Sequence, residues 1–121
     1  MSKTILTVDG SPSMRMLLRA SLVNAGYAVV EAEDGRDALD WLAENEPALV
    51  ITDITMPNLD GFGLITALRA QPRLREIPVL VLTTECEPDK KAKARAAGAT
   101  GWIVKPFDPE KLTAALRRVA H

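Results

Sequence analysis

Residues 48–53 read Ala-Leu-Val-Ile-Thr-Asp, an apolar run of strand length that ends at a single carboxylate. Near-continuous apolar character is typical of a central parallel strand that is covered on both faces. An ionised carboxylate directly after such a strand is costly unless a cation or hydrogen-bond donors compensate it. The run therefore predicts a parallel sheet, with Asp53 at the edge of that sheet where ligands bind.

Apolar runs of similar length lie on either side of this one, and segments of helical period separate them. Regular alternation of strands and helices predicts a parallel sheet with helices on both faces. About five such units occupy residues 1–121, which we interpret as a single domain. The predicted strands are residues 4–8, 28–31, 48–52, 79–82 and 101–104.

Capping residues, prolines and glycines indicate where the helices begin and end. The first helix is predicted to bury an apolar stripe that includes Leu17 and Leu18. The second is predicted to bury either Leu42 or Trp41. The predicted helices start at Ser11-Pro12, Asp37, Asp60, Pro88 and Asp108-Pro109, and the first, second and fourth end near Gly26, Glu44 and Gly98.

The composition is that of a folded soluble protein, with 47% hydrophobic and 26% charged residues among 121. A formal net charge of -1 gives no general attraction to nucleic acid or to an anionic membrane. The chain has no signal-peptide pattern and no apolar run near the roughly 20 residues of a membrane span. A single cysteine allows no intramolecular disulfide. We expect a cytoplasmic protein with no nucleic-acid or membrane partner.

Polar side chains follow four of the predicted strands: Asp9, Asp53, Thr83 and Lys105. The carboxyl ends of parallel strands meet at one edge of a sheet, so these residues should converge. A carboxylate can attack phosphorus to form an acyl phosphate, which then needs positive charge and donors around its oxygens. Taken singly, such residues are more often caps, turn formers or surface groups. Their joint placement favours a phosphate site centred on Asp53.

The same residues lie in four motifs: 7–9 (Thr-Val-Asp), 52–61 (Thr-Asp-Ile-Thr-Met-Pro-Asn-Leu-Asp-Gly), 82–84 (Leu-Thr-Thr) and 98–107 (Gly-Ala-Thr-Gly-Trp-Ile-Val-Lys-Pro-Phe). The chain resembles the receiver domains of bacterial two-component response regulators, and is most similar to the single-domain, CheY-like chemotaxis group. This resemblance implies a doubly wound (βα)5 flavodoxin-like α/β sandwich with sheet order 2-1-3-4-5.

The resemblance also implies a role for individual residues. A sensor histidine kinase would donate the phosphoryl group, and the side chains of Thr55 and Glu85 would tune its hydrolysis. The peptide bond between Lys105 and Pro106 matches one that is cis in the family. Asp53 would be the phosphoacceptor, Lys105 the phosphate-sensing cation, Thr83 the switch hydroxyl and Trp102 the switch aromatic.

One position departs from the family pattern, in which two adjacent acids follow the first strand. Here the pair is Asp9-Gly10, so Gly10 replaces the acid that binds magnesium directly. Asp9, Asp53 and the backbone carbonyl of Thr55 would remain as ligands. We expect Mg²⁺ binding to be weakened at least by the ~10–100-fold typical of losing an outer-shell partner. Asp53 is then phosphorylated with weakened metal dependence, or the chain is a pseudo-receiver that binds proteins without phosphorylation.

Because the chain ends soon after its last helix, we expect no output domain and a monomer that is not an enzyme beyond self-catalysed phosphotransfer. Its signal would pass through the face around Trp102 to a downstream protein, in a pathway such as chemotaxis. Two other functions fit the sequence less well. A flavin-binding module would place a hydroxyl- and glycine-rich loop where Asp9 lies, and an aspartyl-phosphate phosphatase would have a second Asp in place of Thr55.

Overall fold

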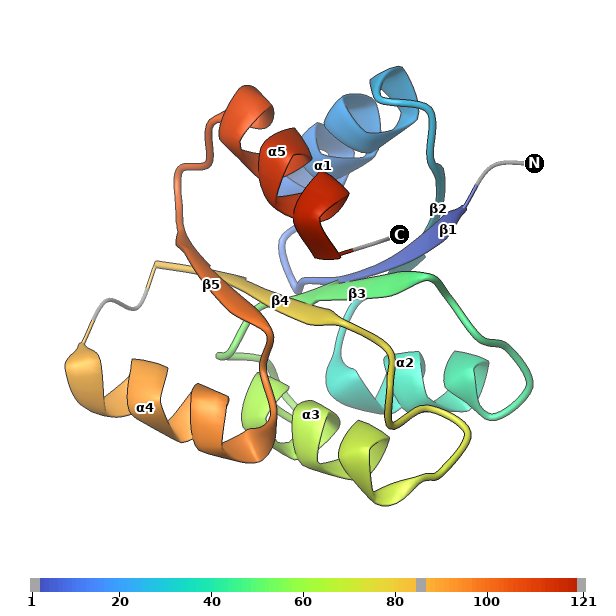
Figure 1. The fold of residues 1–121 in the computed structure, drawn as a ribbon, viewed down its shortest axis with the longest axis vertical. Coiled ribbons are helices and arrows are strands. Elements are labelled where there is room, and N and C mark those ends of the chain that lie inside the picture. The colour runs from blue at the N-terminus through green and yellow to red at the C-terminus, as the bar shows by residue number, and fades with distance from the viewer. Residues whose placement is uncertain (1–2, 85–86, 120–121) are drawn as a thin grey trace.

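The structure of the protein is a computed structural model that describes residues 3–84 and 87–119. Within these ranges five strands alternate with five helices (Figure 1), none of which has the length and apolar character needed to cross a membrane. The elements are β1 (Thr4–Val8), α1 (Pro12–Asn24), β2 (Ala28–Ala32), α2 (Gly35–Leu42), β3 (Leu49–Thr52), α3 (Gly61–Ala70), β4 (Val79–Thr83), α4 (Pro88–Ala97), β5 (Gly101–Val104) and α5 (Pro109–Val119).

The strands form one parallel sheet in the order β2-β1-β3-β4-β5, with β3 at its centre. Helices α1 and α5 cover one face, and α2, α3 and α4 cover the other (Figure 1). The predicted doubly wound, three-layer α/β sandwich is therefore confirmed. Since the strands run in the same direction, the segments that follow β1, β3, β4 and β5 emerge at the same edge.

Strand β3 is held by apolar packing on both of its faces. All four of its residues are buried, as predicted from its apolar character. Successive side chains point to opposite faces, so Val50 packs into the cluster beneath α2, α3 and α4. Leu49 and Ile51 pack into the cluster beneath α1 and α5. This double anchorage fixes the end of the strand, and with it the backbone at Asp53.

Local capping explains where several helices begin and end. The Ser11 hydroxyl accepts a hydrogen bond from the Met14 N–H at 3.3 Å, at the start of α1. Asp60 Oδ1 accepts one from the Gly63 N–H at 2.8 Å, at the start of α3. Gly26 and Gly98 have φ angles of +98° and +115°, the left-handed region that favours glycine after a helix. These predicted boundaries are confirmed.

Two predictions about the helices are wrong. Helix α2 begins at Gly35 and not near Asp37, because Asp34 caps it by accepting a hydrogen bond from the Asp37 N–H at 2.8 Å. The α1 stripe does not include Leu17, which is 57% exposed. Leu18 takes the sheet-facing side of the helix, and a neighbouring residue lies about 100° further around.

Smaller differences concern strand ends and one open alternative. β2 and β4 each continue one residue beyond the predicted end, and β3 begins one residue later. In α2, Leu42 is fully buried while Trp41 is half-buried against the same cluster, so Leu42 is the core residue. None of these differences moves the polar residues away from the carboxyl edge of the sheet.

Candidate functional site

Asp53 lies directly after β3, with its backbone and side chain both held in place. Its N–H donates to the Val8 carbonyl at 2.9 Å, which continues the pairing of β3 with β1. Its Oδ1 accepts from the Ile54 N–H at 2.7 Å. The side chain is 15% exposed. Asp53 is thus a partly accessible carboxylate in a fixed orientation at the edge of the sheet.

Lys105 bridges two carboxylates that lie far apart in the sequence. Its Nζ donates to Asp9 Oδ2 at 2.8 Å and to Asp53 Oδ2 at 2.9 Å. Burial by itself would lower the pKa of Lys105, but the hydrogen bonds to Asp9 and Asp53 outweigh it, and the pKa is raised. Lys105 is therefore an ammonium ion at neutral pH. The predicted meeting of Lys105 with Asp53 is confirmed, and the peptide bond from Lys105 to Pro106 is cis.

Asp9 is the more deeply buried of the two carboxylates, with a side chain that is 4% exposed. Its Oδ1 accepts from the Ser11 N–H at 2.9 Å, while its backbone carbonyl accepts from the Arg15 guanidinium at 2.6 Å. Both carboxylate oxygens of Asp9 are thus engaged, one by a backbone N–H and one by Lys105. Its orientation is set by these contacts.

Position 10 is open. Gly10 is exposed, and of the atoms in residues 3–84 and 87–119 a Cβ built on it would meet one within 4 Å, the Glu33 carbonyl oxygen at 3.7 Å, an ordinary van der Waals contact. The backbone therefore has room for an acidic side chain here, but this chain supplies none.

The residues present do not fit a tightly held magnesium ion. Among residues 3–84 and 87–119, no group of three or more His, Cys, Asp or Glu side chains could hold a metal ion. Asp9 and Asp53 are oxygen donors of the kind that Mg²⁺ prefers, and both already bind Lys105. Thr55 is exposed in the loop after Asp53. Glu85 lies outside the described residues.

Loop 53–60 depends on contacts that sequence analysis missed. A Cβ on Gly61 would lie 2.3 Å from the Asp53 carbonyl oxygen, so only glycine allows α3 to start this close to the site. Asn58, at φ 67°, donates through its amide to Asp34 Oδ2 at 2.7 Å. Asp34 thereby ties the loop to the start of α2. Asp34 before the apolar pattern of α2 is an N-cap signal that could have indicated its role.

Hydrogen bonds to Asp34 also lower its pKa. The largest cause is the backbone N–H of Asp37, followed by the Asn58 amide. Both donors stabilise the ionised carboxylate. The link between α2 and loop 53–60 is therefore strongest when Asp34 is charged.

Thr83 and Trp102 lie on the same face of the sheet. Val81 pairs with Trp102 across β4 and β5, and Thr83 pairs with Val104. Val81 and Trp102 both pack into the cluster beneath α2, α3 and α4. Side chains two residues apart share a face, so Thr83 points to that side as well. Thr83 is 1% exposed at the end of β4, one strand away from Asp53.

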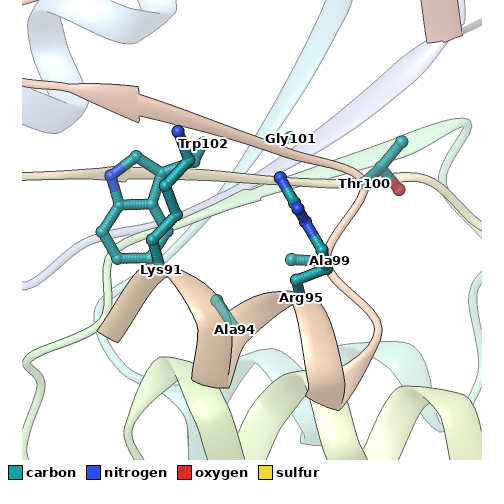
Figure 2. Close-up of a pocket in the computed structure, with 7 residues that line it drawn as sticks. All are labelled: Lys91, Ala94, Arg95, Ala99, Thr100, Gly101 and Trp102. Carbon is teal, nitrogen blue, oxygen red and sulfur yellow. The ribbon is translucent and has the colours of Figure 1, made fainter. Parts of the chain in front are cut away.

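A cavity of about 190 Å³ lies beside Trp102, between α4 and β5 (Figure 2). Lys91 and Arg95 extend from α4 toward the strand, and Trp102 projects over the start of the same helix. Both charged side chains in the cavity lining are cations. Its lining does not include Asp53 or Lys105. Strand β5 links the two places, because it carries Trp102 and ends directly before Lys105.

A family model described as the response regulator receiver domain matches residues 5–117. The chain belongs to the response regulator receiver family. A receiver is the part of a two-component response regulator that takes up the signal. The resemblance inferred from the four sequence motifs is thereby confirmed.

The receiver is similar over its whole length to solved structures of the same family. It matches chemotaxis protein CheY4 of Vibrio cholerae at 43% identity and a TM-score of 0.93, covering 98% of this chain and 99% of that one. The receiver domain of sensor histidine kinase PA1611 from Pseudomonas aeruginosa matches at 27% identity and a TM-score of 0.92, covering 99% and 98%. That structure has a magnesium ion coordinated in its active-site cleft.

Curated relatives of the receiver are longer proteins. The ycf27 protein of Cyanophora paradoxa, named a probable transcriptional regulator, is 38% identical over 115 residues. The ycf27 protein of Porphyridium aerugineum is 36% identical over 115 residues. Each match covers 95% of this receiver and 47% of the relative, so the chain spans about half the length of the curated relatives it matches.

Proposed function

We propose that this receiver accepts a phosphoryl group on Asp53 from a phosphohistidine of a sensor histidine kinase. The observation that carries the proposal is the carboxylate of Asp53 at the end of β3, hydrogen-bonded to Lys105 at 2.9 Å. In the transfer, an Oδ–P bond forms on Asp53 as the P–N bond of the phosphohistidine breaks. The electron pair of that bond stays on the imidazole nitrogen, and the product is an acyl phosphate.

Lys105 and Thr83 would serve the transferred group. The phosphoryl oxygens need positive charge and donors, and Lys105 is a partly buried ammonium in contact with the acceptor. Thr83 ends the neighbouring strand and supplies a hydroxyl. The side chains of Thr55 and Glu85 would tune the hydrolysis of the acyl phosphate.

Magnesium would bind this site weakly. Asp9, Asp53 and the backbone carbonyl of Thr55 are the groups that would hold it, with Gly10 in place of the usual acid. Bound there, the ion would supply positive charge to the transferring phosphoryl group. The residues themselves hold the Asp53 carboxylate in place beside Lys105.

The signal would leave through the face around Trp102. A phosphoryl group brings a charge of about -1.5 to -2, which would be drawn to Lys105 and Thr83. Movement of Thr83 toward the site would leave room for Trp102 to turn inward, because the two share one face of the sheet. The populations of two states would shift, and a downstream protein would bind one of them better.

The same expectations extend to the location, oligomeric state and partners of this receiver. We propose a cytoplasmic signalling domain over residues 1–121 that is monomeric, is not an enzyme beyond its own phosphotransfer, and contacts proteins and not nucleic acid or membrane. Chemotaxis is one pathway that such a receiver would serve.

One observation favours a second candidate function. Gly10 leaves the described residues without a three-group metal site, so the chain could instead be a pseudo-receiver that binds partners without phosphorylation. Asp53, Thr83 and Lys105 would then be structural. The presence of all three together makes phosphorylation the better-supported function.

Tryptophan fluorescence with beryllofluoride, a phosphoryl mimic, tests the proposal in a Trp41→Phe background that isolates Trp102. The emission of Trp102 is expected to change on titration, and Asp53→Asn should abolish the change. Thr83→Val, which removes the hydroxyl at similar volume, should reduce it, while Thr83→Ser should retain it. A response that persists in Asp53→Asn, or no response at any Mg²⁺ concentration, would exclude the phosphoacceptor function.

A further inference from the structure

The pocket around Asp53 must receive an anion although it already holds more acids than cations. Two carboxylates, Asp9 and Asp53, share one ammonium, which lies within hydrogen-bond distance of both. A third acid, at position 10, would leave two uncompensated negative charges beside one lysine. With Gly10 in that position, Lys105 leaves only one uncompensated negative charge among these three groups.

The bridge is partly buried, with only Asp9 fully enclosed, and this strengthens it. The side chains of Lys105, Asp9 and Asp53 are 11%, 4% and 15% exposed. Charge interactions are stronger in this environment than in water, and salt screens them less. Lys105 is also held on its backbone, since its N–H donates to the Thr83 carbonyl at 2.8 Å. The backbone of Lys105 is thus anchored to β4, and its ammonium is held by both carboxylates.

Lys105 retains hydrogen-bonding capacity for a third oxygen. An ammonium has three N–H donors, and within the described residues two of them are used, toward Asp9 and Asp53. A phosphoryl oxygen on Asp53 could accept the third while Lys105 keeps its hydrogen bond to the Asp9 carboxylate.

A divalent ion would have to compete with this arrangement. Mg²⁺ requires near-octahedral oxygen ligands at about 2.0–2.1 Å. Asp9 already gives one oxygen to the Ser11 N–H and the other to Lys105. Ligation by both carboxylates would disturb the bridge, and position 10 offers no side-chain oxygen in return. The donor set of the described residues disagrees with a resident magnesium ion.

We infer that Lys105 supplies the resident countercharge that magnesium supplies in a receiver with two adjacent acids, so that a phosphoryl-shaped anion binds Asp53 without a divalent cation. This inference rests on the proposed function of Asp53. Gly10 then does two things: it removes one magnesium ligand, and it makes the pocket less negative by one charge.

Fluorine NMR of beryllofluoride bound to the full chain tests the inference, because its resonances report occupancy directly. Titrations are made in metal-free buffer and with millimolar Mg²⁺, for wild type and for Gly10→Asp. Wild type is expected to bind in metal-free buffer, with an affinity that Mg²⁺ changes less than about 3-fold. Gly10→Asp is expected to bind at least about 10-fold more tightly when Mg²⁺ is present. Since position 10 is open, circular dichroism should show both proteins folded.

The outcomes separate this inference from the proposed function. Binding by wild type only in the presence of Mg²⁺ would overturn the role of Lys105 and leave Asp53 as acceptor. Equal Mg²⁺ dependence in wild type and Gly10→Asp would overturn the role of Gly10. Loss of binding in both buffers would overturn the proposed function itself. Binding that persists in Asp53→Asn would do the same.

Discussion

Lys105 lies 96 residues after Asp9 in the sequence, and its Nζ is 2.8 Å from Asp9 Oδ2. The same nitrogen is 2.9 Å from Asp53 Oδ2. The sheet order brings the ends of β1, β3, β4 and β5 to one edge, which makes this meeting possible. A single cation therefore joins two carboxylates. Asp53 is the proposed phosphoacceptor, and both are proposed magnesium ligands.

The coupling between Lys105 and Asp9 can be measured by a double-mutant cycle. Lys105→Met leaves Asp9 buried without its cation and is expected to lower the free energy of unfolding by about 2–3 kcal/mol. In the Asp9→Asn background the same change should cost less, with a coupling energy of at least about 1 kcal/mol. Urea unfolding at neutral pH gives the four values. Additivity within about 0.5 kcal/mol would contradict a direct interaction.

Gly10→Asp is expected to tighten Mg²⁺ binding by at least about 10-fold, because it adds a carboxylate beside Asp9 in a position with space for it. Calorimetric titration with Mg²⁺ measures the affinity. Gly10→Asn is the matched control, since it has the same size without the charge and should bind Mg²⁺ much like wild type. An unchanged affinity in Gly10→Asp would show that position 10 does not reach the ion.

Gly61→Ala is expected to destabilise the protein by about 1–3 kcal/mol, since the new Cβ would lie 2.3 Å from the Asp53 carbonyl oxygen and 2.9 Å from the Ile54 Cα. These are backbone atoms that cannot move without shifting the acceptor. Gly63→Ala is the control in the same helix, because its closest contact is the end of the Leu59 side chain. Urea unfolding measures the free energy of unfolding of both variants. Equal losses would show that the close approach of Gly61 to Asp53 does not set the cost of the substitution.

Asp34 should make stability depend on pH, since its folded-state pKa lies below the ordinary value of 3.8. A lowered carboxyl pKa stabilises the fold above the unfolded pKa, and this contribution is lost as pH falls through the folded pKa. The difference in unfolding free energy between wild type and Asp34→Asn is therefore expected to be constant above about pH 5 and to decline below about pH 4. Urea unfolding across this range measures it.

Two controls accompany that experiment. Carboxylates other than Asp34 are present in both proteins, so their titration cancels in the difference. Asp34→Ala removes the cap altogether and should cost about 1 kcal/mol near neutral pH. A wild-type to Asp34→Asn difference that does not vary with pH would show that the carboxylate is not preferentially stabilised in the folded protein.

The sequence by itself determined the features that have local causes. The apolar character of 48–52 predicted a strand covered on both faces, and capping residues such as Ser11 and Asp60 predicted helix starts that the structure confirms. Residues that follow predicted strands, including Asp53 and Lys105, could be assigned to one edge because parallel strands share a direction. Periodicity and capping act within a few residues, so they can be recognised without the fold.

Only the tertiary structure decided which of these side chains touch, and how. Lys105 contacts Asp9 as well as Asp53, and Asn58 is tied to Asp34, because packing brings together segments that are distant along the chain. The exposure of Leu17 was also decided there, since an apolar residue is buried only where a neighbouring layer covers it. Hydrogen bonds and burial across such distances depend on how sheet and helices pack, which local pattern does not specify.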